Sequence, residues 1–147
     1  MNTSGGIVLN RNSQVLLIFR KGKWDLPKGK PEFNESPKIT AKREVVEETG
    51  ISSEHLFVRS FLAKTTYYKK SSKGKLKERT ANWYLMYYSN LCLTTKPQLE
   101  EDISIIRWVD LDQIEKYANF GRCYMKKMIS FLLLNNFEAH VAHQLSI

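Results

Sequence analysis

The chain has 147 residues, of which 42% are hydrophobic and 26% charged, so it is long enough to bury a core without disulfides and too apolar for wholesale disorder. No run approaches the roughly 20 apolar residues that span a bilayer, and the N-terminal residues do not resemble a signal peptide, so we expect no membrane contact. The formal net charge is +8, and the two cysteines, Cys92 and Cys123, are expected to be reduced thiols of a cytoplasmic protein.

The chain begins with two expected strands. Residues 6–9 and 15–20 are β-prone, and residues 10–13 between them are of types that tolerate the positive φ of a tight turn. Residues 26–29 contain Pro and Gly and indicate a break between strand and loop.

A helix is expected next, followed by a long hairpin. Ser36 is a good N-cap, Pro37 suits the first helical position, and Gly50 is placed to end the helix. Residues 57–68 and 80–88 are β-prone runs on either side of a Ser-, Lys- and Gly-containing turn, so we expect a hairpin with a basic tip.

The C-terminal part is expected to hold one strand and two helices. The strand is predicted over 103–109, a short helix capped by Asp110 over 111–117, and an apolar-striped helix over 122–135. Because strands and helices are interleaved and hairpins are present, the predicted fold is α/β (α+β), with helices on both faces of a mixed sheet. No repeat or linker interrupts the chain, so we expect one domain over 1–147.

The positive charge is concentrated in two segments. Residues 20–30 hold five basic side chains and one acid, and residues 64–79 hold seven basic side chains and one acid, whereas the rest of the chain is slightly acidic. Local basicity of this kind favours a site for a polyanion over general nucleic-acid affinity. For residues 69–77 at the hairpin tip, solvated surface lysine is an equally good interpretation.

The expected helix carries a cluster of carboxylates in its last two turns. Glu44, Glu47 and Glu48 fall within an arc of roughly 100°, where like charges repel and the helix dipole disfavours anions. Carboxylates placed against both effects are what a hard divalent cation needs. The alternative is a solvated acidic face, softened by an ion pair between Arg43 and Glu47.

The residues around this cluster match a known motif. From Gly29 the chain has five residues, Glu35, seven residues, Arg43-Glu44-Val45, one residue, Glu47-Glu48, one residue and Gly50-Ile51. This 23-residue stretch resembles the complete box of the Nudix hydrolase (MutT-like) family. The resemblance implies a Nudix-type α/β/α sandwich and a loop–helix–loop that holds Mg²⁺ or Mn²⁺ against a diphosphate.

The resemblance also implies roles for individual residues. Glu47 and Glu48 match the principal metal ligands of the family. Glu44 matches the residue that ligates metal or accepts the proton of the attacking water. The carbonyl of Lys28 matches a further ligand, and Gly29 matches a position where the backbone must approach the site closely.

Other positions of the motif are expected to support the site. Arg43 and Glu35 resemble orienting residues, and Gly50 is expected to be the left-handed helix stop. Asn34 stands where many members have Gly, but Asn tolerates the same conformation. Many members take one more acid from a later loop; Glu101 is our candidate, with plain surface acidity as the alternative.

The substrate is expected to contact basic and aromatic residues. Residues 24–30 resemble the lead-in of branches that act on dinucleoside polyphosphates, oxidised nucleoside triphosphates or diphosphoinositol polyphosphates. Trp24 is a candidate for stacking on a base, although packing is the more usual role of such a residue. The candidate substrate-binding residues are Arg20, Trp24, Lys30, Lys64, Lys70, Lys73, Lys75 and Lys77.

These features together predict a metal-dependent pyrophosphohydrolase. Its substrate is expected to be a nucleoside diphosphate linked to another moiety, with a preference for highly charged small molecules. Nucleic acid and membrane are not expected partners, and a homodimer is the expected oligomer if one forms. The alternative is a non-catalytic Nudix-fold module that binds nucleotide or RNA, but such proteins commonly lose a box carboxylate and this chain has them all.

Overall fold

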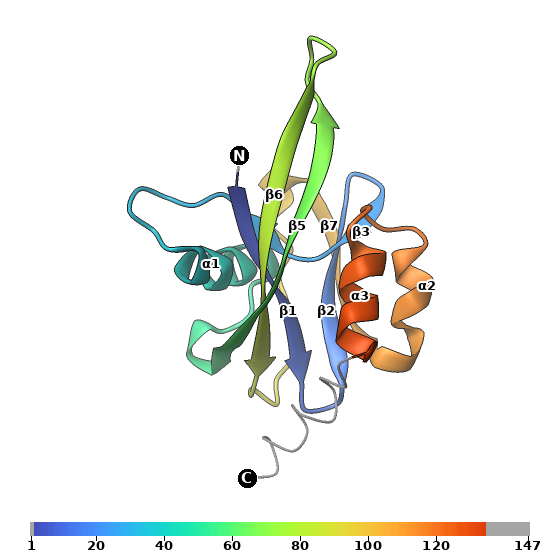
Figure 1. Ribbon diagram of the computed structural model, residues 1–147. Helices are drawn as coiled ribbons and strands as arrows, with labels where there is room; N and C mark the ends of the chain where they lie inside the picture. The colour runs from blue at the N-terminus through green and yellow to red at the C-terminus, as the bar shows by residue number, and fades with distance from the viewer. Residues whose placement is uncertain (1, 135–147) are drawn as a thin grey trace.

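The computed structural model describes residues 2–134, which form a sheet between two helical layers (Figure 1). Short 3-10 turns lie at Ser53–His55, Leu99–Glu101 and Leu111–Gln113. The main elements are β1 (Asn2–Asn10), β2 (Gln14–Arg20), β3 (Lys23–Asp25), β4 (Lys28–Gly29), α1 (Pro37–Thr49), β5 (Leu56–Lys70), β6 (Leu76–Tyr88), β7 (Ile103–Asp110), α2 (Ile114–Ala118) and α3 (Met125–Leu134). No helix in this part of the chain is long and apolar enough to cross a membrane.

The sheet is mixed, as predicted. β1 runs parallel to β6 from Asn2↔Thr80 to Asn10↔Tyr88, and β6 is antiparallel to β5. β1 and β2 are in register at Leu9↔Val15, while β2 continues antiparallel to β7 along its whole length. The sheet therefore opens between β1 and β2. β4 pairs with the first half of β1, and the last two turns of α1 lie against β4 through Glu44 and Glu48.

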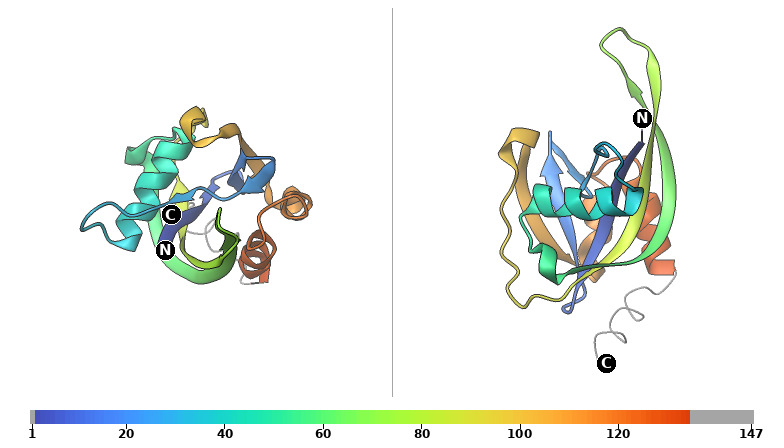
Figure 2. Two further views of the ribbon diagram at one scale, coloured as in Figure 1. Left: turned by 90° about the horizontal axis from the view of Figure 1, so that it is seen from above. Right: turned by 90° about the vertical axis from the view of Figure 1, so that its left-hand side faces the viewer.

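Helices cover both faces of the sheet, which confirms the predicted layers (Figures 1 and 2). α1 contributes Ala41 and Val45 to a core cluster with Val8, Leu16 and Met86 of the strands. α2 and α3 contribute apolar side chains to a second, larger cluster on the opposite face. Burial of the first cluster fixes α1 against β1 and β6, and this contact positions the carboxylates of α1.

The ends of α1 confirm the sequence-based prediction. The Ser36 hydroxyl accepts a hydrogen bond from the Ile39 N–H at 3.3 Å, and Pro37 is the first helical residue. Gly50 has φ = 72°, in the left-handed region, and its N–H donates to the Val46 carbonyl. Local signals alone therefore define this helix.

Three details of the prediction are wrong or incomplete. Asp110 occupies the N-cap position of the 3-10 turn that leads into α2, but it makes no capping hydrogen bond, because its carboxylate accepts one from Gln14 instead. α3 begins at Met125 and not at 122, because the Arg122 N–H donates to the Trp24 carbonyl and holds the chain against β3. The predicted end of this helix at 135 lies outside the described residues. β3 was not predicted at all.

Candidate active site

A cleft of about 420 Å³ brings together seven of the residues singled out in the sequence: Arg20, Lys28, Gly29, Lys30, Glu44, Glu48 and Glu101. It lies where α1, β4, the ends of β2 and β5 and the loop before β7 meet. Three carboxylates and six basic side chains share it. Its lining residues are Thr3, Arg20, Lys21, Lys28, Gly29, Lys30, Glu44, Glu48, Tyr67, Lys69, Arg79 and Glu101.

Glu48 is the deepest carboxylate of the cleft, with only 2% of its surface exposed. Its Oε1 accepts a hydrogen bond from the Lys28 N–H at 3.1 Å, which ties the last turn of α1 to β4. Burial raises the pKa of Glu48 to about 8, and the nearby positive charges of Arg20 and Lys28 oppose this rise without cancelling it.

Glu44 lies one helical turn earlier and contacts the backbone of β4. A Cβ at Gly29 would lie 2.1 Å from the Glu44 carboxyl carbon, so only glycine leaves room for this side chain. The carboxylate accepts a hydrogen bond from Arg43 at 2.8 Å. Burial raises the pKa of Glu44, and Arg43 opposes that shift. The close backbone approach expected at Gly29 is present.

Arg43 organises the charges at the edge of the cleft. Its guanidinium donates to Glu35 at 2.7 and 2.8 Å, to Glu44 at 2.8 Å, to Glu47 at 3.1 Å and to the Lys30 carbonyl at 2.8 Å. These bonds lower the pKa of Glu35 to about 2, chiefly through Arg43, and raise the pKa of Arg43. Both residues therefore hold neighbouring groups in place, which is the arrangement expected of orienting residues.

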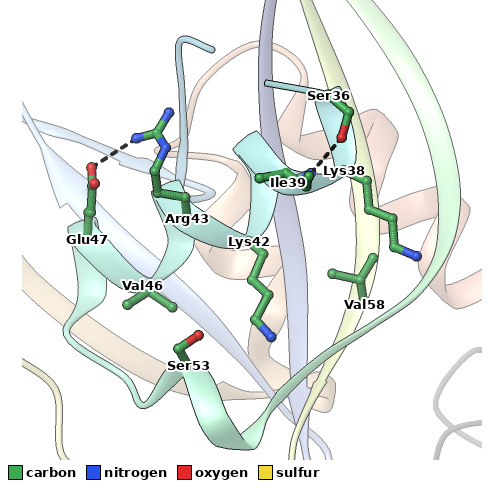
Figure 3. Close-up of a pocket in the computed structure, with 9 residues that line it drawn as sticks. All are labelled: Ser36, Lys38, Ile39, Lys42, Arg43, Val46, Glu47, Ser53 and Val58. Carbon is green, nitrogen blue, oxygen red and sulfur yellow. Dashed lines mark hydrogen bonds and ion pairs between the residues drawn. The ribbon is translucent and has the colours of Figure 1, made fainter. Parts of the chain in front are cut away.

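Glu47 does not join Glu44 and Glu48 in the cleft. Figure 3 shows it directed toward Arg43, whose Nη1 donates to both Glu47 and Glu44. It lines a larger, mostly apolar cavity of about 650 Å³ together with Ile39, Val46 and Val58. That cavity holds no second carboxylate among its lining residues, so we place the chemistry in the cleft. The assignment of Glu47 as a metal ligand stays a prediction.

The donor set of the cleft fits a hard divalent cation. Within residues 2–134, no three acidic, His or Cys side chains converge into a ready-made metal cluster. Burial raises the pKa of Glu48 and of Glu44, and a cation between the two carboxylates would offset this cost. Two carboxylates beside a backbone carbonyl suit Mg²⁺, since this ion keeps several waters as ligands. Glu101, the predicted additional acid, lines the same cleft.

A wall of basic side chains faces the carboxylates. Arg20 and Lys30 were predicted as substrate-binding residues, and Lys69 and Arg79 belong to the basic hairpin that was expected to bind a polyanion, whereas Lys21 was counted only within the basic segment 20–30. Burial lowers the pKa of Lys69, and the positive charges of Lys21, Arg79 and Arg20 lower it further, as expected of closely spaced cations. The strand alternation of the hairpin is the signal that could have separated Lys69 and Arg79 from its other basic residues.

The register of the hairpin divides its basic residues into two groups. Lys69 pairs with Lys77 and Tyr67 with Arg79, so these side chains share the face that continues from buried Trp83. Lys64 and Lys70 are one residue out of step and belong to the opposite face. The tip, with Lys73 and Lys75, projects beyond the sheet in Figure 1. None of Lys64, Lys70, Lys73, Lys75 and Lys77 lines the cleft.

Trp24 is packed against its neighbours. Its ring makes edge-to-face contacts with Phe19 and Tyr117, at centroid distances of 5.0 and 4.9 Å, and the Arg107 guanidinium lies 5.2 Å from it. It does not line the cleft. The packing interpretation is therefore the better one, and base stacking by Trp24 stays a prediction.

Comparison with known proteins agrees with the motif. A family model described as "NUDIX domain" matches residues 2–128, which is most of the chain. In structure, the chain is similar to an Ap4A hydrolase of C. elegans, with a TM-score of 0.71, 20% sequence identity, and coverage of 97% of this chain and 98% of that one. At this identity the likeness concerns the fold.

Two curated proteins are similar in sequence. A putative 8-oxo-dGTP diphosphatase of Bacillus subtilis is 46% identical over 57 residues, which cover 36% of this chain and 38% of that protein. The chain therefore spans well under half the length of this relative. An RNA pyrophosphohydrolase of Acinetobacter baylyi is 28% identical over 149 residues, covering 88% of this chain and 86% of that protein.

Proposed function

Because the chain belongs to the Nudix family, whose hydrolases act on pyrophosphate bonds, we propose that it is a metal-dependent pyrophosphohydrolase of highly charged nucleotides or related polyphosphates. The observation that carries the proposal is the composition of the cleft. Buried Glu48 and half-buried Glu44 face a wall of cations that includes Arg20, Lys69 and Arg79. A substrate that offers a diphosphate to one side and further phosphates to the other matches both.

The carboxylate side of the cleft binds Mg²⁺ or Mn²⁺ in this proposal. Glu48, Glu44 and the Lys28 carbonyl would hold the ion, and Glu47 would join them only if it released Arg43. The bound ion supplies neutralisation of the diphosphate charge and makes water a usable nucleophile near neutral pH. Glu44 or Glu101 accepts the proton of the attacking water, and Arg43 keeps the Glu44 carboxylate in place.

The cationic side sets the substrate class. Closely spaced cations contribute the most binding free energy to small molecules with several linked phosphates. They contribute less to a sugar-linked diphosphate such as ADP-ribose, which carries about two charges. We therefore propose dinucleoside polyphosphates, nucleoside triphosphates or diphosphoinositol polyphosphates as substrates of a cytoplasmic enzyme.

A substrate panel tests the proposal. Diadenosine tetraphosphate, 8-oxo-dGTP, an inositol pyrophosphate, 5′-triphosphate RNA and ADP-ribose are incubated with Mg²⁺ or Mn²⁺ in ¹⁸O-labelled water. The label identifies the phosphorus that is attacked, and matched reactions with EDTA or with Glu44→Gln are the controls. Binding without turnover would support the non-catalytic module, and a preference for ADP-ribose would contradict the charge argument.

The lysines of the hairpin tip are a separate part of the proposal. Neutralising Lys70, Lys73, Lys75 and Lys77 together is expected to raise KM for highly charged substrates if the tip closes over them. Exposed contacts are worth only about 0.2–1 kcal/mol each, so the combined change is at most about one to two orders of magnitude and weakens with salt. Equal responses of all substrates would show that the tip is only solvated surface.

A further inference from the structure

A second cavity opens directly from the basic wall of the cleft. It has a volume of about 450 Å³, and we call it the cationic chamber. Arg20, Lys21, Lys28, Tyr67 and Lys69 line both spaces, so the two are continuous. The chamber is completed by Lys23, Tyr68, Arg122, Cys123 and Tyr124. Six of its ten lining residues are basic and none of the ten is acidic, in contrast to the cleft.

One carboxylate lies beneath the chamber. Asp25 is fully buried, and three cations surround its Oδ2: Lys28 Nζ at 3.6 Å, Arg20 Nη2 at 3.8 Å and Arg122 Nε at 3.9 Å. Its Oδ1 accepts hydrogen bonds from the Leu26 N–H and from the Tyr124 hydroxyl. The carboxylate is therefore fixed at one oxygen and faces three cations with the other.

These ion pairs are not complete hydrogen bonds. All three distances exceed the 2.7–3.2 Å typical of N–H···O bonds. The Nε atoms of Arg20 and Arg122 are buried and have no hydrogen-bond partner, and neither has Asp25 Oδ2. One carboxylate also cannot neutralise three cations. The arrangement thus presents excess positive charge and unused donors, a costly state that an anion would relieve.

We propose that the cationic chamber binds the phosphates of the substrate that lie beyond the bond being cleaved, and that Asp25 is the positioning residue that holds Arg20, Lys28 and Arg122 for this purpose. The proposal rests on the proposed function for the identity of the substrate. The chamber itself requires only a chain of phosphates. Arg20 joins the two halves because it lines both the cleft and the chamber.

The chain contains its own probe of the chamber. Cys123 lines it and is exposed, while Cys92 is an exposed free thiol in the loop after β6 and lines neither space. The alkylation rate of each thiol can be measured by mass spectrometry with and without inorganic tripolyphosphate, in EDTA so that no hydrolysis occurs. We expect tripolyphosphate to slow alkylation of Cys123 several-fold and to leave Cys92 unchanged.

Paired variants connect the protection to the named cations. Arg122→Gln is expected to weaken tripolyphosphate binding about tenfold, because it removes a charged donor, and Arg122→Lys is expected to restore part of the affinity. Arg11→Gln is the matched control, since it removes the same charge from the exposed β1–β2 turn. Equal effects of Arg122→Gln and Arg11→Gln would overturn the proposal, because only net charge would then matter.

Asp25→Asn tests the positioning role through the direction in which the affinity for anions changes. The substitution removes a negative charge beneath the chamber, so a purely electrostatic effect would strengthen anion binding. If Asp25 positions the cations, binding weakens and KM for a polyphosphate substrate rises more than kcat falls. Tighter or unchanged binding contradicts the positioning role. If Asp25→Asn does not fold, Arg20→Gln provides the second test, with weaker tripolyphosphate binding expected.

The test separates the chamber from the proposed function. If tripolyphosphate binding depends on Arg122 but the protein hydrolyses none of the panel, the chamber is supported as a phosphate-binding site and the proposed enzyme activity is refuted. If the protein hydrolyses substrates of the panel but tripolyphosphate does not protect Cys123, the proposed enzyme activity is supported and phosphate binding in the chamber is refuted.

Discussion

Two carboxylates of the same motif lie in opposite electrostatic environments. Glu35 accepts two hydrogen bonds from Arg43, and its pKa is lowered to about 2. Glu48 is buried at the other end of α1, and its pKa is raised to about 8. The first charge is already satisfied by the protein, and the second is not. The difference separates Glu35, which supports the motif, from Glu48, which we propose as a metal ligand.

The largest effect is expected for Glu48→Gln. The amide keeps the size of the side chain and can still accept the Lys28 N–H, but it removes a charged ligand. Because loss of a supporting contact to a ligand already costs 10- to 100-fold, we expect activity to fall by more than about 100-fold. Thermal melts in EDTA should show no loss of stability. A marked loss would mean that Glu48 is structural, like Glu35.

Arg43→Gln is expected to remove the contrast between Glu35 and Glu48, because it takes away the donor that lowers the pKa of Glu35. It leaves Glu35, Glu44 and Glu47 without their shared donor, so we expect a stability loss of about 1–3 kcal/mol together with an activity loss of about 10- to 100-fold. Urea unfolding and steady-state kinetics on the same samples measure both. A loss of activity with unchanged stability would instead indicate that Arg43 contacts the substrate directly.

Gly29→Ala is expected to affect activity more than stability. The new Cβ would collide with the end of the flexible Glu44 side chain, which can rotate away from Arg43. We expect about a tenfold fall in kcat, because a displaced base loses part of its contribution, with little change in melting temperature. Gly22→Ala is unsuitable as a control because Gly22 has φ = 78°. Ala63→Gly, on β5 and outside the motif, measures the general cost of an alanine–glycine exchange.

The smallest effect concerns pH, and its sign distinguishes the two carboxylates. A raised pKa means that the folded protein binds more protons, so the contribution of Glu48 to stability without metal falls as pH rises from about 4.5 to about 8. A lowered pKa acts in reverse, so the contribution of Glu35 is lost as pH falls from about 4.5 toward 2. Melting temperatures in EDTA are measured against pH. Glu48→Gln should lose the fall in stability between about pH 4.5 and 8, and Glu35→Gln should lose the fall in stability below about pH 4.5. If both variants changed the same pH range, the two carboxylates would not differ as described.

What the sequence predicts well is what neighbouring residues decide. Ser36, Pro37 and Gly50 define α1 through contacts within a turn or two, and the spacing of Glu44 and Glu48 then places both on one face. The i,i+4 spacing of Arg43 and Glu47 already indicated an ion pair, but the sequence could not decide between this pair and a place in the cleft, because a helical arc of roughly 100° includes side chains on either flank of the site.

What was missed depends on contacts between distant segments. β3 is three residues long and forms because Trp24 and Lys23 pair with β2. In the sequence Asp25 is only one acid in a basic segment. Its contact with Arg122, from the turn before α3, is visible only in the folded protein. Residue type indicated the carboxylate half of the site, whereas register and tertiary contact determined the basic half.

The parallel pairing of β1 with β6 has a consequence for how the protein is made. Asn2 pairs with Thr80, so during synthesis β1 must wait for a partner that lies 78 residues later in the chain. At 5–20 residues per second this delay is roughly 4–16 s. Until then α1 has only part of the surface that it covers in the folded protein, and its clustered carboxylates remain in water. Synthesis must therefore be well past the middle of the chain before the cleft can form.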